Sequence, residues 1–285
     1  MKIYVLGSKG MLGKYVSTYL SEHYEVINVT RNEIDASNSN EENLHSKLFH
    51  LGVRENDIIV NCIGVIKPMV DSLGDLVTIR VNSVFPRILA NVCEKLKVKL
   101  IHPTTDCVYT GNEGNYDENS VHDISDVYGR TKSLGEPNNC TVIRTSIIGE
   151  EVNQSRSLVE WVKSSKESTI FGFTNHFWNG VTCLEFAKIC KKIIDNKIFW
   201  LGVRHIHSNT VSKKELVEMI SNVYDLKINI TPKETEDKCD RSLSTIYPEL
   251  LYSMNIPSLN DQIIEMKNFS KNLFDNQLDK IENLN

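Results

Sequence analysis

Two hydrophobic patterns alternate along the first half of the chain. Short apolar runs are typical of strands covered on both faces, whereas apolar residues spaced three or four apart are typical of helices. The strand-like runs lie at residues 3–6, 26–29, 57–64, 99–102 and 141–145. Helical spacing covers 12–20, 41–51 and 76–96, and Pro86 predicts a kink in the last of these. This alternation predicts an α/β fold with a doubly wound parallel sheet of the Rossmann type.

The pattern is looser after residue 150. Helical spacing begins again at Ser157, and both Thr182-x-x-Glu185 and Ser212-x-x-Glu215 have the form of capping boxes that open further helices. A short strand is expected at 228–230 and an amphipathic helix over 259–274. We therefore expect residues 1–150 to form the sheet domain. Residues 151–285 should form mainly a smaller lobe, with some segments returning to the first domain.

Composition and charge narrow the classes of partner. The chain has 285 residues, of which 40% are hydrophobic, and a formal net charge of -5. This charge, in the absence of a basic run, argues against a nucleic-acid partner. No apolar stretch approaches the roughly 20 residues that span a bilayer, so no membrane partner is expected. The N-terminus reads as a strand and not as a signal peptide.

The seven cysteines predict a reducing compartment. Their number is odd and none forms a Cys-x-x-Cys pair. Four of them lie in apolar runs, namely Cys62, Cys93, Cys140 and Cys190. We interpret them as reduced thiols of a cytoplasmic protein. His205-x-His207 is the one histidine pair with a short spacing, and on a strand it is more typical of a surface or core feature, so no metal site is expected.

A glycine-rich turn follows the first strand directly. Gly7 permits a tight turn, Gly10 allows backbone to approach a pyrophosphate, and Gly13 allows the next helix to pack close to the sheet. The intervening residues Ser8, Met11 and Leu12 belong to the same predicted cofactor site. The spacing is three and three, not the two and three of the usual dinucleotide fingerprint, so an ordinary glycine turn stays open as an alternative.

The ends of the next two strands supply further candidate cofactor contacts. Arg31 follows the second strand, where an arginine suits the 2′-phosphate of NADP and a carboxylate would suit NAD. A surface arginine is the alternative. Asp35 is expected near the adenine. Cys62, Ile63 and Gly64 end the third strand, at the sheet edge that faces the ligand in a doubly wound fold.

Tyr128 and Lys132 form the strongest chemical pattern. Residues four apart lie on one face of a helix, and a cation beside a phenol favours the phenolate and lowers its pKa towards the working pH. The pair could then deliver a proton to a substrate oxygen. Tyr-x-x-x-Lys is common on solvated helix faces, so its meaning depends on what accompanies it.

These features occur in order along the chain: the glycine turn, a small-residue strand end, Thr-Thr-Asp at a later strand end, and Tyr-x-x-x-Lys after a loop. Together they resemble the extended short-chain dehydrogenase/reductase family, and within it the dTDP-4-dehydrorhamnose reductase branch. The matching residues are Gly7-x-x-Gly10-x-x-Gly13, Asn61-Cys62-Ile63-Gly64, Thr104-Thr105-Asp106-Cys107-Val108-Tyr109, Tyr128-Gly129-x-x-Lys132 with Gly135-Glu136, Ile143-Arg144-Thr145 and Asp240-Arg241-Ser242-Leu243.

The resemblance implies an NADP(H) cofactor and a catalytic set. Thr105 would hydrogen-bond a substrate carbonyl oxygen, and Tyr128 would protonate that oxygen as hydride reaches the carbon. Lys132 would hold the nicotinamide ribose and acidify Tyr128. Hydride attack builds negative charge on the oxygen, so donors aimed at it lower the barrier.

Substrate contacts are implied at the matching positions Asp106, Arg144 and Arg241. The two arginines would lie towards a nucleotide sugar, where a guanidinium pairs well with a diphosphate. Trp178 could stack on a uracil or sugar face, and packing in the core is the alternative. Cys107 stands where the branch commonly has an aromatic residue.

The implied activity is NADPH-dependent reduction of the 4-keto group of a nucleotide-linked 4-keto-6-deoxy sugar. The segment 171–178 is more similar to reductases of UDP-linked sugars, including 2-acetamido forms, than to the thymidine-sugar enzymes.

An NAD-dependent 4-epimerase or dehydratase, and a non-catalytic NADP-binding regulatory subunit, stay open as alternatives. Arg31 argues against the first two, and the complete Thr-Tyr-Lys set argues against the last. A homodimer is left open.

Overall fold

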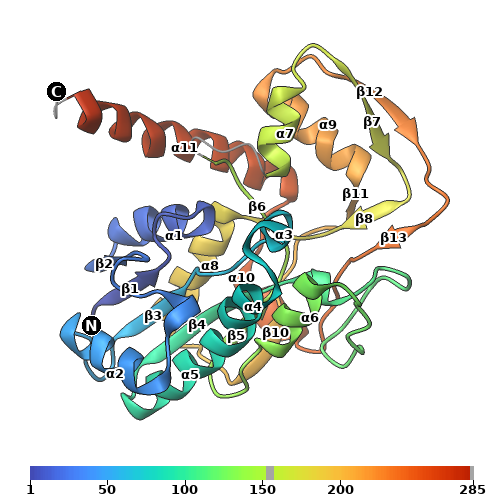
Figure 1. The fold of residues 1–285 in the computed structure, drawn as a ribbon. Coiled ribbons are helices and arrows are strands. Elements are labelled where there is room, and N and C mark those ends of the chain that lie inside the picture. Colours follow the sequence, from blue (N-terminus) through green and yellow to red (C-terminus); the bar gives the residue numbers. More distant parts are fainter. Residues whose placement is uncertain (152–156, 283–285) are drawn as a thin grey trace.

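A computed structural model describes residues 1–151 and 157–282 (Figure 1). Its main layer is a six-stranded sheet in the order β10-β5-β4-β3-β1-β2, and every pairing in it is parallel. The strands are β1 (Ile3–Leu6), β2 (Val26–Val29), β3 (Ile58–Asn61), β4 (Lys99–Thr104), β5 (Thr141–Arg144) and β10 (Gly202–His205). The apolar runs of the sequence thus form a parallel sheet, as predicted.

The order of the strands reverses next to β1. Leu6 at the end of β1 is in register with Val29 of β2 on one side and with Asn61 of β3 on the other. The chain therefore leaves β1 in one direction and returns on its opposite side, which opens a crevice beyond the carboxyl ends of these strands. Such a switch point is where doubly wound α/β folds bind their ligands.

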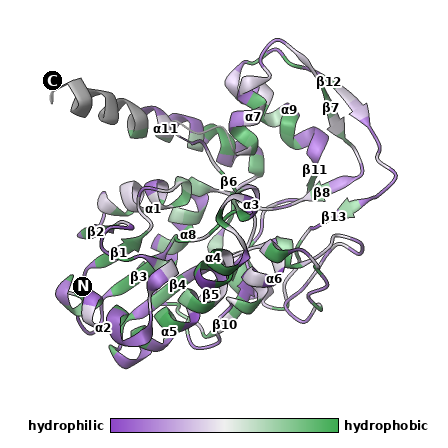
Figure 2. Ribbon diagram, viewed as in Figure 1, coloured by the Kyte–Doolittle hydropathy of each residue, from purple (hydrophilic) through white to green (hydrophobic). Residues whose placement is uncertain are grey.

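Helices cover both faces of the sheet. Side chains alternate along β1, so that Ile3 and Val5 pack with one set of helices and Tyr4 and Leu6 with the other. The first face carries α1 (Met11–Ser21) and α8 (Cys183–Asp195), and the second carries α2 (Glu41–His50) and α5 (Phe85–Lys95). Figure 2 shows apolar residues on the strands and on the inner faces of these helices.

The predicted long helix over 76–96 is divided into three segments. They are α4 (Asp75–Ile79), the π-helical η3 (Arg80–Val84) and α5, which has Pro86 in its first turn. Proline has no N–H and its ring collides with the carbonyl four residues earlier, here that of Asn82. The wider π turn accommodates this collision, and the N–H of Phe85 bonds the carbonyl of Arg80. The expected disturbance at Pro86 therefore takes the form of a π segment before it.

The second half builds a smaller lobe above the sheet edge (Figure 1). Its strands are β6 (Ile147–Ile148), β7 (Thr169–Phe173), β8 (His176–Trp178), β9 (Val181–Thr182), β11 (Val211–Ser212), β12 (Asn229–Lys233) and β13 (Cys239–Asp240). Its helices are α7 (Leu158–Ser164), α9 (Lys213–Tyr224) and α11 (Leu259–Glu282), whereas α10 (Pro248–Met254) packs with α8 on the main sheet. The remaining short helices are η1 (Ala36–Asn38), η2 (Lys67–Met69), α3 (Val70–Leu73), η4 (Asp106–Val108) and α6 (Val127–Leu134).

The two expected capping boxes differ. Ser212 and Glu215 satisfy each other's backbone N–H groups, which is the complete box. Thr182 caps α8 by accepting from the N–H of Glu185, but the N–H of Thr182 donates to Gln262 of α11 at 3.1 Å. Glu185 therefore does not return its carboxylate to the cap. Its side chain is buried, and neither carboxylate oxygen has a hydrogen-bond partner.

The second half also contributes to the main sheet. β10 pairs with β5, and α8 packs beside α1, although both elements follow residue 150. Over the part of the chain that the structure describes, no helix is long and apolar enough to span a bilayer.

Candidate functional site

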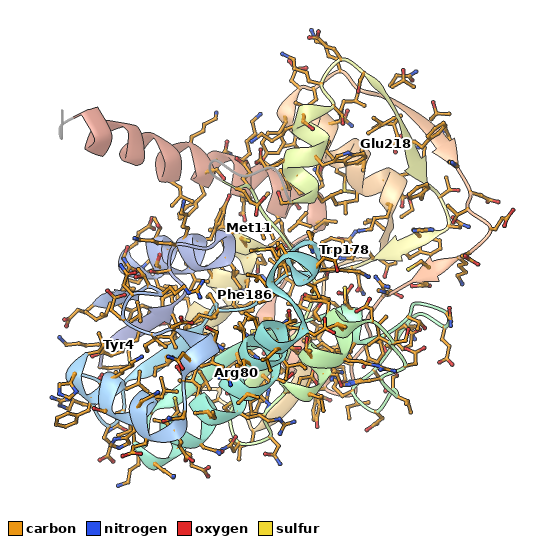
Figure 3. The ribbon with its side chains drawn as sticks, in the orientation of Figure 1. Tyr4, Met11, Arg80, Trp178, Phe186 and Glu218 are labelled. Carbon is orange, nitrogen blue, oxygen red and sulfur yellow. The ribbon has the colours of Figure 1, made fainter. Side chains whose placement is uncertain are left out.

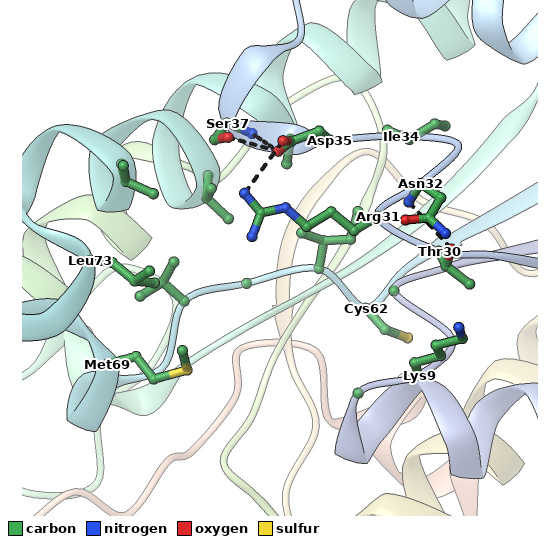
Figure 4. Close-up of a pocket in the computed structure, with 18 residues that line it drawn as sticks. Lys9, Thr30, Arg31, Asn32, Ile34, Asp35, Ser37, Cys62, Met69 and Leu73 are labelled. Carbon is green, nitrogen blue, oxygen red and sulfur yellow. Dashed lines mark hydrogen bonds and ion pairs between the residues drawn. The ribbon is translucent and has the colours of Figure 1, made fainter.

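Two adjoining hollows form one cleft along the carboxyl edge of the sheet. Their volumes are about 410 Å³ and about 430 Å³, and they share Gly10, the segment 62–65 and Met69. The first, shown in Figure 4, reaches Arg31 and Asp35. The second reaches Thr105, Tyr128 and Lys132. The predicted cofactor positions and the predicted catalytic positions thus lie at opposite ends of a continuous cleft.

The glycine turn shapes the middle of this cleft. Gly7 has a φ of 75°, which favours glycine, and a Cβ on Gly13 would overlap the carbonyl oxygen of Gly7. A Cβ on Gly10 would meet that same oxygen at 3.4 Å. Gly10 also begins α1 without a side-chain cap, so the first N–H groups of the helix are available to an anion. This cradle fits a pyrophosphate.

Gly10, Met11 and Leu12 line the cleft, whereas Ser8 is nearly buried and donates to the carbonyl of Val29. Ser8 therefore supports the turn from behind.

Two cations lie at the first end of the cleft. Lys9 and Arg31 both line it, and the Arg31 side chain is 76% exposed. Arg31 is 3.4 Å from the carboxylate of Asp35, whose other contacts are the N–H and hydroxyl of Ser37 (Figure 4). The Ser37 hydroxyl, followed by its N–H and by Arg31, lowers the pKa of Asp35, so this carboxylate is ionised. Arg31 lies exposed at the rim, where its guanidinium can meet a 2′-phosphate.

The segment after β3 forms the floor shared by both hollows. The side-chain oxygen of Asn61 accepts from the N–H of Ile63 at 3.2 Å, and its amide lies 3.1 Å from Nδ1 of His102. Asn82, from the π segment, accepts from the N–H of Val65 at 2.8 Å and donates to its carbonyl at 3.0 Å. These buried amides hold the 62–65 backbone against the cleft.

Thr105, Tyr128 and Lys132 meet at the second end. Thr105 follows β4 and caps η4, and Tyr128 and Lys132 lie on α6, whose cap is Asp126. All three line the same hollow, and the Thr105 hydroxyl lies beside the Tyr128 phenol. Thr105 also donates to the Asp106 carboxylate at 3.1 Å and accepts from the N–H of Cys107 at 3.1 Å. A phenol, an ammonium group and a hydroxyl therefore share one wall.

Burial determines the charge of the Tyr128 phenol. It raises the pKa of Tyr128 well above its usual value, and the neighbouring Thr105 hydroxyl opposes this only in part. The direction is opposite to the lowering by Lys132 that the Tyr-x-x-x-Lys spacing led us to expect. The physical reason is that a phenolate partly covered by the surrounding protein loses more hydration than its neighbours return. Tyr128 therefore stays protonated near neutrality and is poised as a proton donor.

Burial also acts on Lys132. It lowers the pKa of the Lys132 ammonium to about 8, and the carboxylate of Glu136 partly offsets the effect. The ammonium group is still mostly charged at neutral pH. A Cβ built on Gly64 would lie 3.8 Å from its Nζ, so the lysine reaches the shared floor of the cleft.

The four remaining candidates for substrate contact do not line either hollow. Asp106 is 2% exposed and its carboxylate faces Thr105 and Cys107. Arg241 donates from Nε to the carbonyl of Tyr109 at 3.0 Å and lies behind Cys107, which does line the cleft.

Arg144 and Trp178 are turned away more completely. Arg144 is 2% exposed and bound to Glu136. Trp178 is 4% exposed and packs in the core of the second lobe, in the apolar cluster that also contains Met11 (Figure 3). The core alternative therefore describes Trp178.

Several lining residues were not anticipated from the sequence. Val65, Met69, Leu73 and Val77 give the first hollow an apolar wall, and Lys67 adds a cation to the second. Lys67 also pairs with Asp126 at 2.7 Å. Lys67 lies in the short helix η2 that follows the third strand, and neither it nor the apolar residues carry a sequence signal for a cleft.

Seven free cysteines and no group of three metal-ligating side chains occur within the described residues.

The fold and the cleft define a Rossmann-type nucleotide-binding α/β protein with a hydroxyl, a phenol and an amine at one end of its crevice. Comparison with known proteins places it further: residues 1–243 match the family described as RmlD substrate binding domain, and the chain belongs to this family.

Two curated relatives match part of the chain. The dTDP-4-keto-6-deoxy-D-glucose reductase of Streptomyces niveus is 30% identical over 157 residues, which are 50% of this chain and 51% of that protein. The dTDP-4-dehydrorhamnose reductase of Mycobacterium tuberculosis is 24% identical over 141 residues, or 47% of this chain and 44% of that protein. The chain thus spans about half the length of the curated relatives it matches.

Solved structures are similar over nearly the whole chain. The dTDP-4-dehydrorhamnose reductase of Bacillus anthracis, in complex with NADP, has a TM-score of 0.78 at 19% identity and covers 93% of this chain and 98% of its own. The dTDP-glucose 4,6-dehydratase of Bacillus anthracis, in complex with NAD, has a TM-score of 0.68 at 16% identity, with 95% and 97% covered. A reductase and a dehydratase share this fold, so the fold alone does not select the activity.

Proposed function

We propose that this chain is an NADPH-dependent reductase that acts on the 4-keto group of a nucleotide-linked 4-keto-6-deoxy sugar. The observation that carries the proposal is the meeting of Thr105, Tyr128 and Lys132 on one wall of a cleft whose middle is shaped by a glycine turn. Relatives over half of the chain are reductases of dTDP-linked keto sugars, which supports the same reaction.

In the proposed mechanism the protein supplies orientation and a proton. When bound, NADPH provides the hydride. Thr105 and Tyr128 donate hydrogen bonds to the substrate carbonyl oxygen, and the Tyr128 phenol gives its proton to that oxygen as charge develops. Lys132 holds the nicotinamide ribose and stabilises the negative charge left on Tyr128. A Tyr128 that is neutral at rest suits the reductive direction.

The choice of NADPH over NADH rests on the first end of the cleft. Lys9 and the exposed Arg31 are both available to a 2′-phosphate, whose charge an unaccompanied carboxylate would repel. The only carboxylate that lines this end within the described residues is Asp35, and it is already engaged by Ser37 and Arg31.

We extend the proposal to the sugar nucleotide. The names of the relatives favour a dTDP-linked substrate, whereas the segment 171–178 supports a UDP-linked one, including 2-acetamido forms. Cys107, small and at the cleft wall, leaves more space there than an aromatic residue would. The free cysteines support a cytoplasmic location. The proposal also includes a homodimer.

A panel of nucleotide sugars tests the proposal. Purified protein is supplied with dTDP- and UDP-linked 4-keto-6-deoxy sugars, with and without a 2-acetamido group, and NADPH oxidation is followed by absorbance. We expect turnover with at least one sugar, and a loss of about 10²-fold or more in Tyr128→Phe with NADPH binding retained. No oxidation with any sugar would refute the proposal.

The same experiment separates the alternatives. Cofactor that copurifies as NAD and is not consumed would indicate an internal oxidation–reduction cycle, as in an epimerase or dehydratase. NADPH binding without turnover, together with a copurifying enzyme, would indicate a regulatory subunit.

A further inference from the structure

A buried ion pair lies directly behind the catalytic helix. Arg144, at the end of β5, donates from Nε to Oε1 of Glu136 at 3.1 Å and from Nη2 to Oε2 at 2.6 Å. The two side chains are 3% and 7% exposed. Two parallel N–H···O bonds between planar groups give a fixed geometry as well as attraction.

The other donors of Arg144 are also used. Nη1 donates to the Tyr109 hydroxyl and to Nε2 of His205, both at 2.7 Å, and Nη2 donates to Nε2 of His122 at 2.8 Å. A guanidinium has five N–H groups. The three bonds described here and the two to Glu136 account for all five. Arg144 therefore keeps no donor for a substrate phosphate, and its function must be internal.

The histidines that receive these bonds are uncharged. Because Nε2 accepts from Arg144 in each ring, the proton lies on Nδ1, which faces Ser133 Oγ in His122 and the carbonyl of Ser244 in His205. Burial and then Arg144 lower the pKa of both histidines, that of His205 to about 4. Among the described residues, Arg144 is therefore the charged group in direct contact with Glu136 at neutral pH.

Glu136 is placed to act on Lys132. It follows Lys132 by four residues, just beyond the end of α6. The other titratable groups facing Lys132 are Tyr128 on α6, His102 on β4 and Cys107 on η4. Burial raises the pKa of the Tyr128 and Cys107 groups and lowers that of His102, so all three are neutral near pH 7. Lys67 and Glu151 line the same hollow.

We propose that Glu136, clamped by Arg144, is a positioning residue for Lys132: it anchors the end of the catalytic helix and supplies the negative charge that keeps the Lys132 ammonium protonated in a buried wall. Arg144 donates a hydrogen bond to each carboxylate oxygen of Glu136 and so fixes its position. The carboxylate then attracts Lys132 through space without binding it, so the ammonium remains free for the cofactor ribose. The role of Lys132 at the ribose rests on the proposed function.

Because Glu136 and Arg144 carry opposite charges, removing one or the other should shift the pH at which Lys132 loses its proton in opposite directions. Glu136→Gln removes the negative charge and leaves Arg144 uncompensated, so Lys132 should lose its proton at lower pH. Arg144→Met leaves the carboxylate unscreened, so Lys132 should keep its proton to higher pH. The double variant removes both charges and should lie between Glu136→Gln and the wild type, because Glu136 acts on Lys132 more strongly than Arg144 does. A purely structural pair would instead weaken the fold in each single variant without opposite titration shifts.

Lysine NMR measures this without a sugar substrate. Protein labelled with ¹³C at lysine Cε is titrated from pH 6 to 11, and Lys132→Met identifies the resonance of Lys132. We expect the midpoint to move by about one pH unit or more downward in Glu136→Gln and upward in Arg144→Met. Glu185→Gln, which removes another buried carboxylate on the distant helix α8, is the matched control and should not shift it.

Arg144→Lys covers the case in which a neutral substitution fails to fold. It keeps the charge and should preserve the midpoint while lowering the melting temperature, since one amine cannot make five hydrogen bonds. Shifts in the same direction for both single variants, or none, would overturn the proposal. If the opposite shifts occur but the wild type reduces no keto sugar, Glu136 sets the charge of Lys132 and only the proposed function fails.

Discussion

The hydroxyl of Ser83 donates to the carbonyl oxygen of Thr131 at 2.7 Å, so the π segment η3 grips the helix that carries Tyr128 and Lys132. Asn82, its neighbour in η3, contacts the same helix at the Thr131 hydroxyl and at Gly135. The two helices approach so closely because position 135 has no side chain: a Cβ there would overlap the carbonyl oxygen of Asn82.

Gly135→Ala should therefore displace α6, which carries Tyr128 and Lys132. The obstacle is backbone, which cannot rotate aside, so we expect a loss of about 1–3 kcal/mol in the free energy of unfolding. Turnover should fall more than cofactor binding, because Lys132 and Tyr128 move relative to Thr105. Urea unfolding and steady-state kinetics measure both. Arg130→Ala, a change at an exposed residue of the same helix, is the control.

Gly13→Ala and Gly10→Ala should differ sharply in NADPH affinity. The Cβ at 13 would overlap the Gly7 carbonyl, whereas that at 10 would meet the same oxygen at an ordinary 3.4 Å. We expect Gly13→Ala to open the turn and weaken binding by 10-fold or more, about 1.4 kcal/mol. Gly10→Ala should lose less, and only through contact with the bound pyrophosphate. Fluorescence titration with NADPH distinguishes them, and equal losses would contradict the assignment.

Arg31→Glu should shift the cofactor preference towards NADH. Replacing the cation at the rim by an anion repels a 2′-phosphate, so KM for NADPH should rise by about 10- to 100-fold while KM for NADH changes little. Lys238→Glu makes the same change of charge on an exposed residue of the second lobe and should leave both constants unaltered. An Arg31→Glu enzyme with unchanged preference would place the 2′-phosphate elsewhere.

The rate of reduction should fall as pH rises through the pKa of Lys132. Burial lowers this pKa to about 8 in the free protein, and the active form is the protonated amine, so kcat/KM for NADPH should be constant below about pH 7 and decline above pH 8. Tyr128 should not contribute an alkaline limb below pH 10, since burial raises its pKa. A rate that increased with pH between 7 and 9 would contradict both assignments.

Glu185→Gln should stabilise the protein at high pH. Burial raises the pKa of Glu185 to about 7, so the folded state binds this proton more tightly than the unfolded state does. Stability contributed by the protonated form is present at low pH and is lost as pH rises to 7, where the charged carboxylate lacks a hydrogen-bond partner. We expect a gain of roughly 1–3 kcal/mol at pH 8 and almost none at pH 4. Thermal melts at both values test this.

The sequence pattern predicts the fold, and the family resemblance predicts which residues meet at the cleft. Apolar runs find their places in a parallel sheet, and strand ends collect at one edge, so Thr105, Tyr128 and Lys132 converge although none is adjacent. The direction in which a side chain points, and how deeply it is buried, cannot be predicted in the same way. The partners of Arg144 lie on separate elements, including His122 and His205, and no spacing links them.

The burial of a side chain likewise cannot be predicted from the hydrophobic pattern of its own segment. The Tyr-x-x-x-Lys spacing gives the right helix face, but whether the phenol is hydrated is decided by distant segments that cover it, and this reverses the direction of its pKa. The position of Trp178 could not be predicted for the same reason, since a ring on a short strand can face either a ligand or the core, and here it faces the core. The π segment could not be predicted, because over five residues its hydrophobic pattern cannot be distinguished from that of an α-helix.

The return of β10 and α8 to the main sheet means that the chain cannot be cut in the middle and still leave an intact nucleotide-binding half. A fragment that stopped at residue 150 would expose the sheet face on which Ile3 and Val5 pack against Phe186 and Ile189. We therefore expect such truncated fragments to aggregate, and protease cleavage near the middle of the native chain to leave two pieces that remain associated and still bind coenzyme.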